Sequence, residues 1–361
     1  MLSLWNADNA KTQKWYQIPL DGCVSSTGKP YRITAKKGTT NRLLVNFVGG
    51  GFSWNEETAA NPLTIGTMLR GKDGFYISDL SPVLLNLGHV GLFSASDKRS
   101  PFYDWHILNI PYTSGDFHIG NNEFPYKDAK GENKVLYHHG QRNVASALTV
   151  LKNFFCQTPD VLMIMGQSAG GAGCVAHCPQ IQSLYPECNH VIVYSEGTHF
   201  LSSLFPDIVN NVWQASPDLT AYIESEDLMS DLFRYAQDNM PSSTLFLHSN
   251  SVWDGMLAKY MNKMNHDDFS IHSQALQELH DTLLQTNRKL KKEISNYSYY
   301  LTDYGKKKKD GTTPHIFAGT PKLLYDEMQD GMSLANWLCQ AIEGTPVDVG
   351  AKFAEANFKH I

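Results

Sequence analysis

The sequence of 361 residues lacks several features that mark particular classes of protein. No apolar run approaches the roughly 20 residues that a membrane-spanning helix needs, which argues against an integral membrane protein. Six cysteines are few for this length, so a small scaffold held together by disulfides is not indicated. No basic segment followed by an apolar core is visible at the N-terminus. We therefore expect a cytoplasmic protein, which would instead be secreted if a signal had been removed.

Charge is limited as well. Charged residues make up 18% of the chain and the formal net charge is −6, which argues against a general nucleic-acid binder.

The spacing of Cys174, His177, Cys178 and Cys188 matches no paired zinc-ligand pattern, so we expect no metal and no cofactor. Hydrophobic residues make up 42% of the chain, enough for a large core, and no linker or repeat divides it. This predicts a single domain over residues 1–361.

What the sequence does contain is an apolar run that ends in a glycine-rich serine turn. The run at residues 161–165 is followed by Gly166-Gln167-Ser168-Ala169-Gly170, a G-x-S-x-G pentapeptide. Such a turn between a strand and a helix holds its serine in a strained backbone conformation, and the flanking glycines avoid a clash there. The motif predicts Ser168 as a nucleophile, although glycine-rich serine turns also occur as plain loops.

A second glycine-rich segment, Gly49-Gly50-Gly51, follows a strand-like run at residues 43–48. Successive glycines allow the backbone to approach a ligand closely. Hydrolases with a serine elbow take one oxyanion donor from such a loop and another from the residue after the nucleophile. The backbone N–H groups of Gly51, Phe52 and Ala169 are therefore the predicted oxyanion hole. The alternative interpretation of the segment is a flexible turn.

Strand-like and helix-like segments alternate along the chain. Strands are predicted at residues 43–48, 106–112, 161–165, 191–194 and 245–247, and helices at residues 143–155, 228–236 and 271–294. This order predicts an α/β fold with a largely parallel central sheet flanked by helices. Ligands of such sheets bind at the carboxyl ends of the strands, where the loops that follow them meet.

A nucleophilic serine needs a base, and the base needs an orienting carboxylate. In hydrolases with this elbow the chain order is serine, acid, histidine. Asp254 follows the strand predicted at residues 245–247, and His315 lies in a later loop, so both fit that order. Order alone does not select them, because other histidines follow the serine and Glu196 is a competing acid. Those other histidines are His248, His266, His272 and His280.

Several short motifs together resemble those of the pectin acetylesterase and Notum family. They are Gly49-Gly50-Gly51-Phe52-Ser53-Trp54, Ile110-Pro111-Tyr112-Thr113-Ser114-Gly115-Asp116, Gly140-Gln141-Arg142, Gly166-Gln167-Ser168-Ala169-Gly170-Gly171 and Ser251-Val252-Trp253-Asp254. The resemblance implies an α/β-hydrolase-like fold and a carboxylic ester hydrolase, with Ser168 as nucleophile, His315 as base and Asp254 as orienting acid. Further candidates for substrate binding are Gly50, Trp54, Asp116 and Glu196.

The chain departs from the family's usual pattern at three positions. Phe52 and Ser53 stand where family members commonly carry tryptophan and cysteine, and Gln167 stands in place of a cysteine before the nucleophile. The family's disulfides are largely absent as well. We expect a serine esterase that deacetylates a carbohydrate or another small ester, with no nucleic-acid or membrane partner. The alternatives are a Notum-like deacylase of longer acyl chains and a non-catalytic carbohydrate-binding protein on a decayed hydrolase fold.

Overall fold

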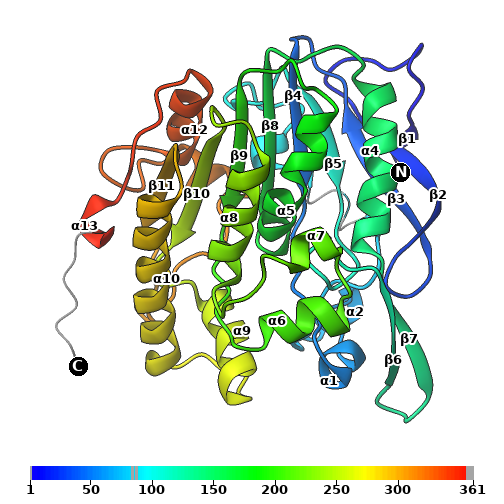
Figure 1. The fold of residues 1–361 in the computed structure, drawn as a ribbon, viewed down its shortest axis with the longest axis vertical. Coiled ribbons are helices and arrows are strands. Elements are labelled where there is room, and N and C mark those ends of the chain that lie inside the picture. Colours follow the sequence, from blue (N-terminus) through cyan, green and yellow to red (C-terminus); the bar gives the residue numbers. More distant parts are fainter. Residues whose placement is uncertain (1, 83–84, 86–87, 355–361) are drawn as a thin grey trace.

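The computed structural model describes residues 2–82, 85 and 88–354, and a nine-stranded sheet runs through this part of the chain (Figure 1). The strand order is β1-β2-β3-β5-β4-β8-β9-β10-β11. All neighbours from β5 to β11 are parallel, whereas β3 runs antiparallel to both β2 and β5. The predicted α/β class with a mostly parallel sheet is thus confirmed.

The strands of this sheet are β1 (Ser3–Leu4), β2 (Trp15–Val24), β3 (Pro30–Lys36), β4 (Arg42–Phe47), β5 (His106–Ile110), β8 (Val161–Gln167), β9 (Val191–Glu196), β10 (Leu245–Ser251) and β11 (Tyr297–Thr302). A separate antiparallel hairpin consists of β6 (Asn122–Lys127) and β7 (Asn133–His138). In Figure 1 this hairpin projects from the lower right of the molecule.

All but the last of the longer helices lie between strands of the main sheet in chain order, and the last one follows β11. They are α4 (Gly140–Phe154), α5 (Ala169–Ser183), α8 (Leu228–Asn239), α9 (Gly255–His266), α10 (Ser273–Glu293) and α12 (Leu334–Ile342). Short helical segments lie in the loops and after β11: α1 (Glu56–Ala60), α2 (Ile65–Leu69), α6 (Phe205–Asp207), α7 (Pro217–Thr220), α11 (Pro321–Tyr325), α13 (Ala351–Ala354), a 3₁₀ turn at Gly91–Phe93 and a π-helical turn at Ile208–Val212.

Both faces of the sheet are buried, because side chains alternate across each strand. On β8, Ile164 belongs to the large cluster that also contains apolar residues of α4, α5, α8 and α10, which cover one face in Figure 1. Met163 and Met165 belong to a second cluster with apolar residues of α12. Burial on two sides explains why residues 161–165 are continuously apolar, as is typical of a central parallel strand.

Each predicted helix and strand is found within a few residues of its expected limits. The strand predicted at residues 245–247 continues to Ser251. The sequence analysis did not anticipate β1, β2, β3, β6, β7 or β11. The single-domain organisation stays a prediction, and the ends of the proposed domain, residue 1 and residues 355–361, lie outside the described residues.

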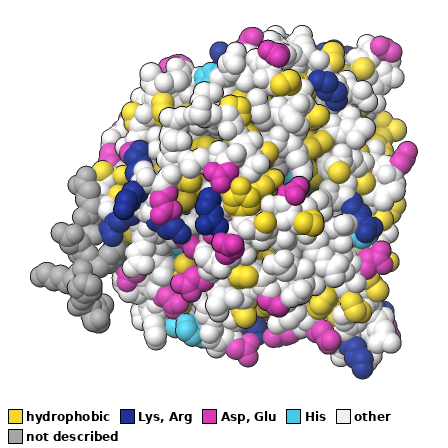
Figure 2. Space-filling model, viewed as in Figure 1, with side chains coloured by type: hydrophobic (Ala, Val, Ile, Leu, Met, Phe, Trp, Pro, Cys, Tyr) yellow, Lys and Arg dark blue, Asp and Glu magenta, His cyan; other side chains and the backbone are white. Residues whose placement is uncertain are grey.

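Charges on the surface are mixed. On the face drawn in Figure 2, basic and acidic side chains of the described residues lie interspersed, with scattered apolar side chains between them. Mixed charge of this kind supports solubility and gives that face no extended basic field for a polyanion. No helix within the described residues is both long and apolar enough to cross a bilayer.

Candidate active site

Ser168 lies on a strained turn between β8 and α5. Its backbone has φ 52° and ψ −128°, a conformation that a residue with a Cβ atom rarely adopts. Two hydrogen bonds fix the turn: the Ser168 N–H donates to Glu196 O over 2.8 Å, and the Gly171 N–H donates to Ser168 O over 2.7 Å. The geometry is that of a nucleophile elbow, which exposes the serine side chain at the carboxyl edge of the sheet.

The glycines of the motif are required by close packing. A Cβ atom on Gly166 would lie 2.0 Å from Gly170 O, and one on Gly170 would lie 2.1 Å from Phe47 O. Either distance is far below van der Waals contact, so a larger residue would force the backbone apart. The elbow therefore depends on the small residues that made it visible in the sequence.

His315 and Asp254 meet at the same edge of the sheet. His315 Nδ1 lies 2.5 Å from Asp254 Oδ2, and the Asp254 side chain is fully buried. Asp254 follows β10 and caps α9, because its Oδ1 accepts the N–H groups of Met256 and Leu257. The two loops are joined directly, since the Thr313 N–H donates to the carbonyl of the residue before Asp254. Asp254 is thus anchored on one side and holds the imidazole with the other.

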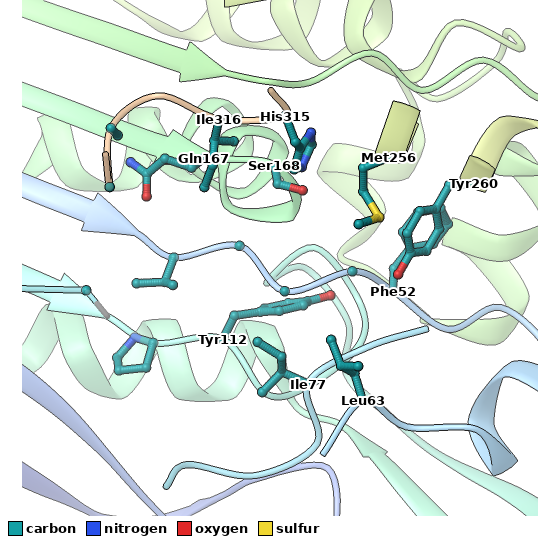
Figure 3. A pocket seen from close by; sticks show the side chains of 18 of the residues that line it. Phe52, Leu63, Ile77, Tyr112, Gln167, Ser168, Met256, Tyr260, His315 and Ile316 are labelled. Carbon is teal, nitrogen blue, oxygen red and sulfur yellow. The ribbon is translucent and has the colours of Figure 1, made fainter. Parts of the chain in front are cut away.

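The charge of Asp254 acts on the His315 imidazole. Burial lowers the pKa of His315, but the attraction and hydrogen bond of Asp254, with a contribution from Glu196, outweigh burial and raise that pKa above 6.5. A ring held in this way presents Nε2 on the side away from Asp254. Ser168 and His315 line the same cavity, and Figure 3 shows both at one wall of it.

The other candidate histidines are occupied elsewhere. His248 lies within β10, is 2% exposed, and contacts Thr198 O and the Tyr297 hydroxyl through its two ring nitrogens. His280 stacks on Trp253 at 4.1 Å. The remaining two, His266 and His272, have side chains that are 54% and 42% exposed. Among the described histidines, the structure therefore pairs His315 with Asp254.

The glycine-rich loop after β4 passes beside Ser168. A Cβ atom on Gly49 would lie 2.8 Å from the Cβ atom of Ser168, and Gly50 and Gly51 line the cavity. The assignment of Phe52 as an oxyanion donor is corrected, because its N–H donates to Phe75 O over 2.8 Å. The N–H of Gly51 stays a candidate donor in this loop, and the N–H of Gly50, which was not predicted as a donor, is a further one.

Two of the residues predicted to bind substrate serve the scaffold instead. Trp54 is 6% exposed and packs edge-on against Phe75, at a ring distance of 5.4 Å. Asp116 is fully buried, accepts the N–H of Gly140 and the hydroxyl of Ser114, and burial raises its pKa to about 6. Neither residue lines the cavity beside Ser168.

Glu196 does not line the cavity either, so its predicted role in substrate binding is also corrected. It is the last residue of β9 and is 1% exposed. One carboxylate oxygen accepts the N–H groups of Phe317 and Ala318, in the loop that carries His315. Gly50 is the one residue of the predicted substrate-binding set that lines the cavity.

The cavity beside Ser168 and His315 has a volume of about 360 Å³ and a mainly apolar lining. The sequence analysis missed the side chains that give it this character, because they come from loops and helices with no recognisable motif. In Figure 3, Leu63 and Ile77 lie on the far side of the Tyr112 ring from Ser168. The apolar side chains that line it include Leu63, Ile77, Leu80, Leu85, Phe93, Tyr112, Phe200, Met256, Leu257, Tyr260, Phe269 and Ile316.

Metal ligation finds no support in the described part of the chain, where no group of three or more His, Cys, Asp or Glu side chains is arranged to hold an ion. Cys174 and Cys178 are fully buried free thiols, and burial raises the pKa of both. His177 contacts the carbonyl of His118 through Nε2 and is part of the scaffold behind the elbow.

A strained serine at the carboxyl edge of a mostly parallel sheet, with a histidine–aspartate pair from later loops, defines the α/β-hydrolase class. The chain belongs to the pectinacetylesterase family, whose model matches residues 21–298. Among curated proteins, pectin acetylesterase 5 from Arabidopsis thaliana is 23% identical over 191 residues, which are 52% of this chain and 41% of that protein. The match therefore spans less than half of that relative's length.

Solved structures show the same fold. Two crystal forms of the Wnt deacylase Notum from Drosophila align with a TM-score of 0.62, at 13% and 14% identity. The alignments cover 92% of this chain and 94% and 95% of those chains. The predicted family and the predicted α/β-hydrolase-like fold are both confirmed, and the family is one of carboxylic ester hydrolases.

The predicted cytoplasmic location is wrong, because the pectin acetylesterase and Notum relatives are secreted or extracellular enzymes. The prediction relied in part on the small number of cysteines. All six are free in the structure, and four of them are buried. A core of this size does not need disulfides for stability, so cysteine count does not identify the compartment of a chain this long.

Proposed function

We propose that this protein is a serine carboxylic ester hydrolase in which Ser168 is the nucleophile, His315 the general base and Asp254 the carboxylate that orients the imidazole. The observation that carries the proposal is the 2.5 Å contact between His315 Nδ1 and Asp254 Oδ2, beside a serine held on a strained elbow at the same cavity. Membership of an esterase family supports the same chemistry.

The proposed reaction has two steps. The Ser168 oxygen attacks the ester carbonyl carbon while His315 Nε2 takes the hydroxyl proton, and Asp254 stabilises the imidazolium that forms. The bond to the alcohol then breaks, and the alcohol leaves with the proton from His315. Water attacks the acyl-serine with His315 again as base, which releases the acid and restores the serine hydroxyl.

The negative charge on the carbonyl oxygen needs hydrogen-bond donors in place before the reaction. Ala169 is the first residue of α5, so its N–H belongs to the helix terminus that points donors at the site. The loop after β4 supplies the N–H of Gly50 or Gly51 from the other side. Losing one such donor typically costs about 3 kcal/mol in the barrier.

Two classes of acyl group are candidates. The family and the Arabidopsis relative, a pectin acetylesterase by name, favour an acetyl group on a carbohydrate. The apolar cavity of about 360 Å³ favours a longer acyl chain, because an acetyl group leaves most of such a cavity empty. The cavity is an observation on this chain itself, and we therefore favour the longer acyl group.

The test is a pair of serine variants. We expect Ser168→Ala to abolish both the hydrolysis of p-nitrophenyl esters and covalent labelling by a fluorophosphonate probe. Ser183→Ala, at the exposed far end of α5, is the matched control and should retain both. Hydrolysis at an unchanged rate by Ser168→Ala would refute the proposal. Absence of labelling in the wild-type protein would favour a non-catalytic binding protein instead.

A further inference from the structure

Glu196 makes contacts with both halves of the proposed machinery. Its backbone carbonyl accepts the N–H of Ser168 over 2.8 Å. Its side-chain Oε1 accepts the N–H of Phe317 over 2.7 Å and that of Ala318 over 3.1 Å. One residue at the end of β9 thus binds the nucleophile elbow through its main chain. Through its side chain it binds the loop that carries His315, called the histidine loop below.

The histidine loop rests closely on this point of the sheet. The residue after Glu196 is Gly197, with φ 62°, and a Cβ atom there would lie 2.9 Å from His315 O. The backbone of the histidine loop can approach β9 this closely because Gly197 has no side chain. Charge-assisted hydrogen bonds to backbone N–H groups are about twice as strong as neutral ones, so the Glu196 carboxylate is well suited to hold the loop against the sheet.

The second carboxylate oxygen of Glu196 is buried, and in the described structure it has no hydrogen-bond partner. A buried carboxylate with one oxygen unpaired costs stability, and the two hydrogen bonds to the other oxygen offset that cost only in part. The carboxylate at this position is therefore explained better by a role at the site than by stability.

We propose that Glu196 is a positioning residue, which sets the distance between the His315 imidazole and the Ser168 hydroxyl and contributes a negative charge that favours the imidazolium formed during acyl transfer. The inference rests on the proposed function. Glu196 itself touches neither the cavity nor the reacting atoms, so it acts through the loop and through its field.

The negative charge of Glu196 depends on pH, because the group is ionised mainly above its own pKa. Burial raises the pKa of Glu196 to about 7, against the opposing effects of the two N–H donors and of His315. On the neighbouring strands, its register partners Gln167 and Ser249 carry no charge. On its own strand, Tyr194 interacts with it, and burial raises the pKa of that phenol well above 10.

The His315 ring faces two carboxylates, those of Asp254 and Glu196, and both raise its pKa. The enzyme needs neutral His315 as base, so activity rises with pH through this pKa. Glu196 is about half ionised near pH 7, so removing its charge lowers the pKa of His315 and moves the acidic limb of the pH profile to lower pH, by less than the loss of a permanent charge would. A residue with a purely structural role would reduce the rate without moving that limb.

Three variants test the inference. Glu196→Gln keeps an acceptor for the Phe317 and Ala318 N–H groups and removes the charge, whereas Glu196→Ala removes both. Asp231→Asn is the matched control, because Asp231 is likewise buried, at 2% exposed, and accepts backbone N–H groups, but these belong to Glu224 and Ser225 and not to the loop that carries His315. Each protein is assayed for kcat, KM, pH profile, thermal midpoint and fluorophosphonate labelling.

We expect Glu196→Ala to lower kcat roughly 100-fold, as misplacement of a catalytic group by about 1 Å does, with little change in KM. Glu196→Gln should recover most of that rate and show an acidic limb shifted to lower pH. Asp231→Asn should lower the thermal midpoint alone. A folded Glu196→Ala variant with wild-type kcat would overturn the inference. If that variant does not fold, an acidic limb of the pH profile that is not shifted in Glu196→Gln would overturn it. Wild-type protein that neither hydrolyses esters nor labels at Ser168 would instead refute the proposed function.

Discussion

Acyl chain length is the sharpest test of what the cavity binds. Transfer of one methylene group from water to an apolar site is worth about 0.8 kcal/mol, or about fourfold in kcat/KM when the gain is retained in the transition state. The cavity of about 360 Å³ has room for several methylene groups beyond an acetyl. Burying three of them predicts a preference of roughly 60-fold for octanoate over acetate in p-nitrophenyl esters.

Narrowing the cavity on the side opposite Ser168 tests where the acyl chain lies within it. Ile77 lies across the Tyr112 ring from Ser168 in Figure 3, so Ile77→Phe fills space that only a longer acyl group reaches. We expect this variant to lose about 10-fold or more on octanoate and to keep its rate on acetate within about threefold. A profile that is highest on acetate, or equal losses on both esters, would refute an acyl chain in this cavity.

Two further predictions follow from buried charged groups. Asp254→Asn retains a cap for α9 but no longer holds His315 in the required tautomer. We therefore expect kcat to fall by about 10³ to 10⁴, while the free energy of unfolding changes by less than about 1 kcal/mol. A loss of kcat below tenfold would contradict the assignment of Asp254. Burial lowers the pKa of Lys36 from 10.5 to about 8 despite Asp104. Between pH 8 and 10.5 the unfolded state binds more protons than the folded state, so the free energy of unfolding measured with urea should rise with pH over this range. A similar rise in Lys36→Met would show that Lys36 is not its cause.

The parts of the structure that follow from local chemistry were predictable from the sequence. The elbow at Ser168 requires an apolar strand and flanking glycines, and both are visible in consecutive residues. Strand β8 was visible as a continuous apolar run because both of its faces are buried. Asp254 was recognisable as a candidate because it follows a strand, whereas the helix α9 that it caps was not predicted. The choice of His315 came from resemblance, since neither spacing nor order distinguishes it from the other histidines.

The parts that depend on contacts between distant segments were not predictable in this way. Phe52 directly follows the glycines of the predicted oxyanion loop, yet its N–H is used by Phe75 O, which nothing in the local sequence indicates. Glu196 was a competing acid because it follows a strand, but its partners lie 121 and 122 residues further along the chain. The cavity lining likewise comes from separate loops and helices that only the fold brings together.

The proposed site is a set of loops joined to one another as well as to the sheet. The elbow after β8 donates to the carbonyl of Glu196 at the end of β9, and the Glu196 side chain holds the loop after β11. That loop donates from Thr313 to the segment after β10, where Asp254 meets His315. Because each loop is a hydrogen-bond partner of the next, a disturbance of one connection moves the others. Substitutions at Glu196 should therefore alter the geometry between Ser168 and His315, even though its carboxylate accepts the backbone N–H groups of Phe317 and Ala318 rather than a hydrogen bond from either of these side chains.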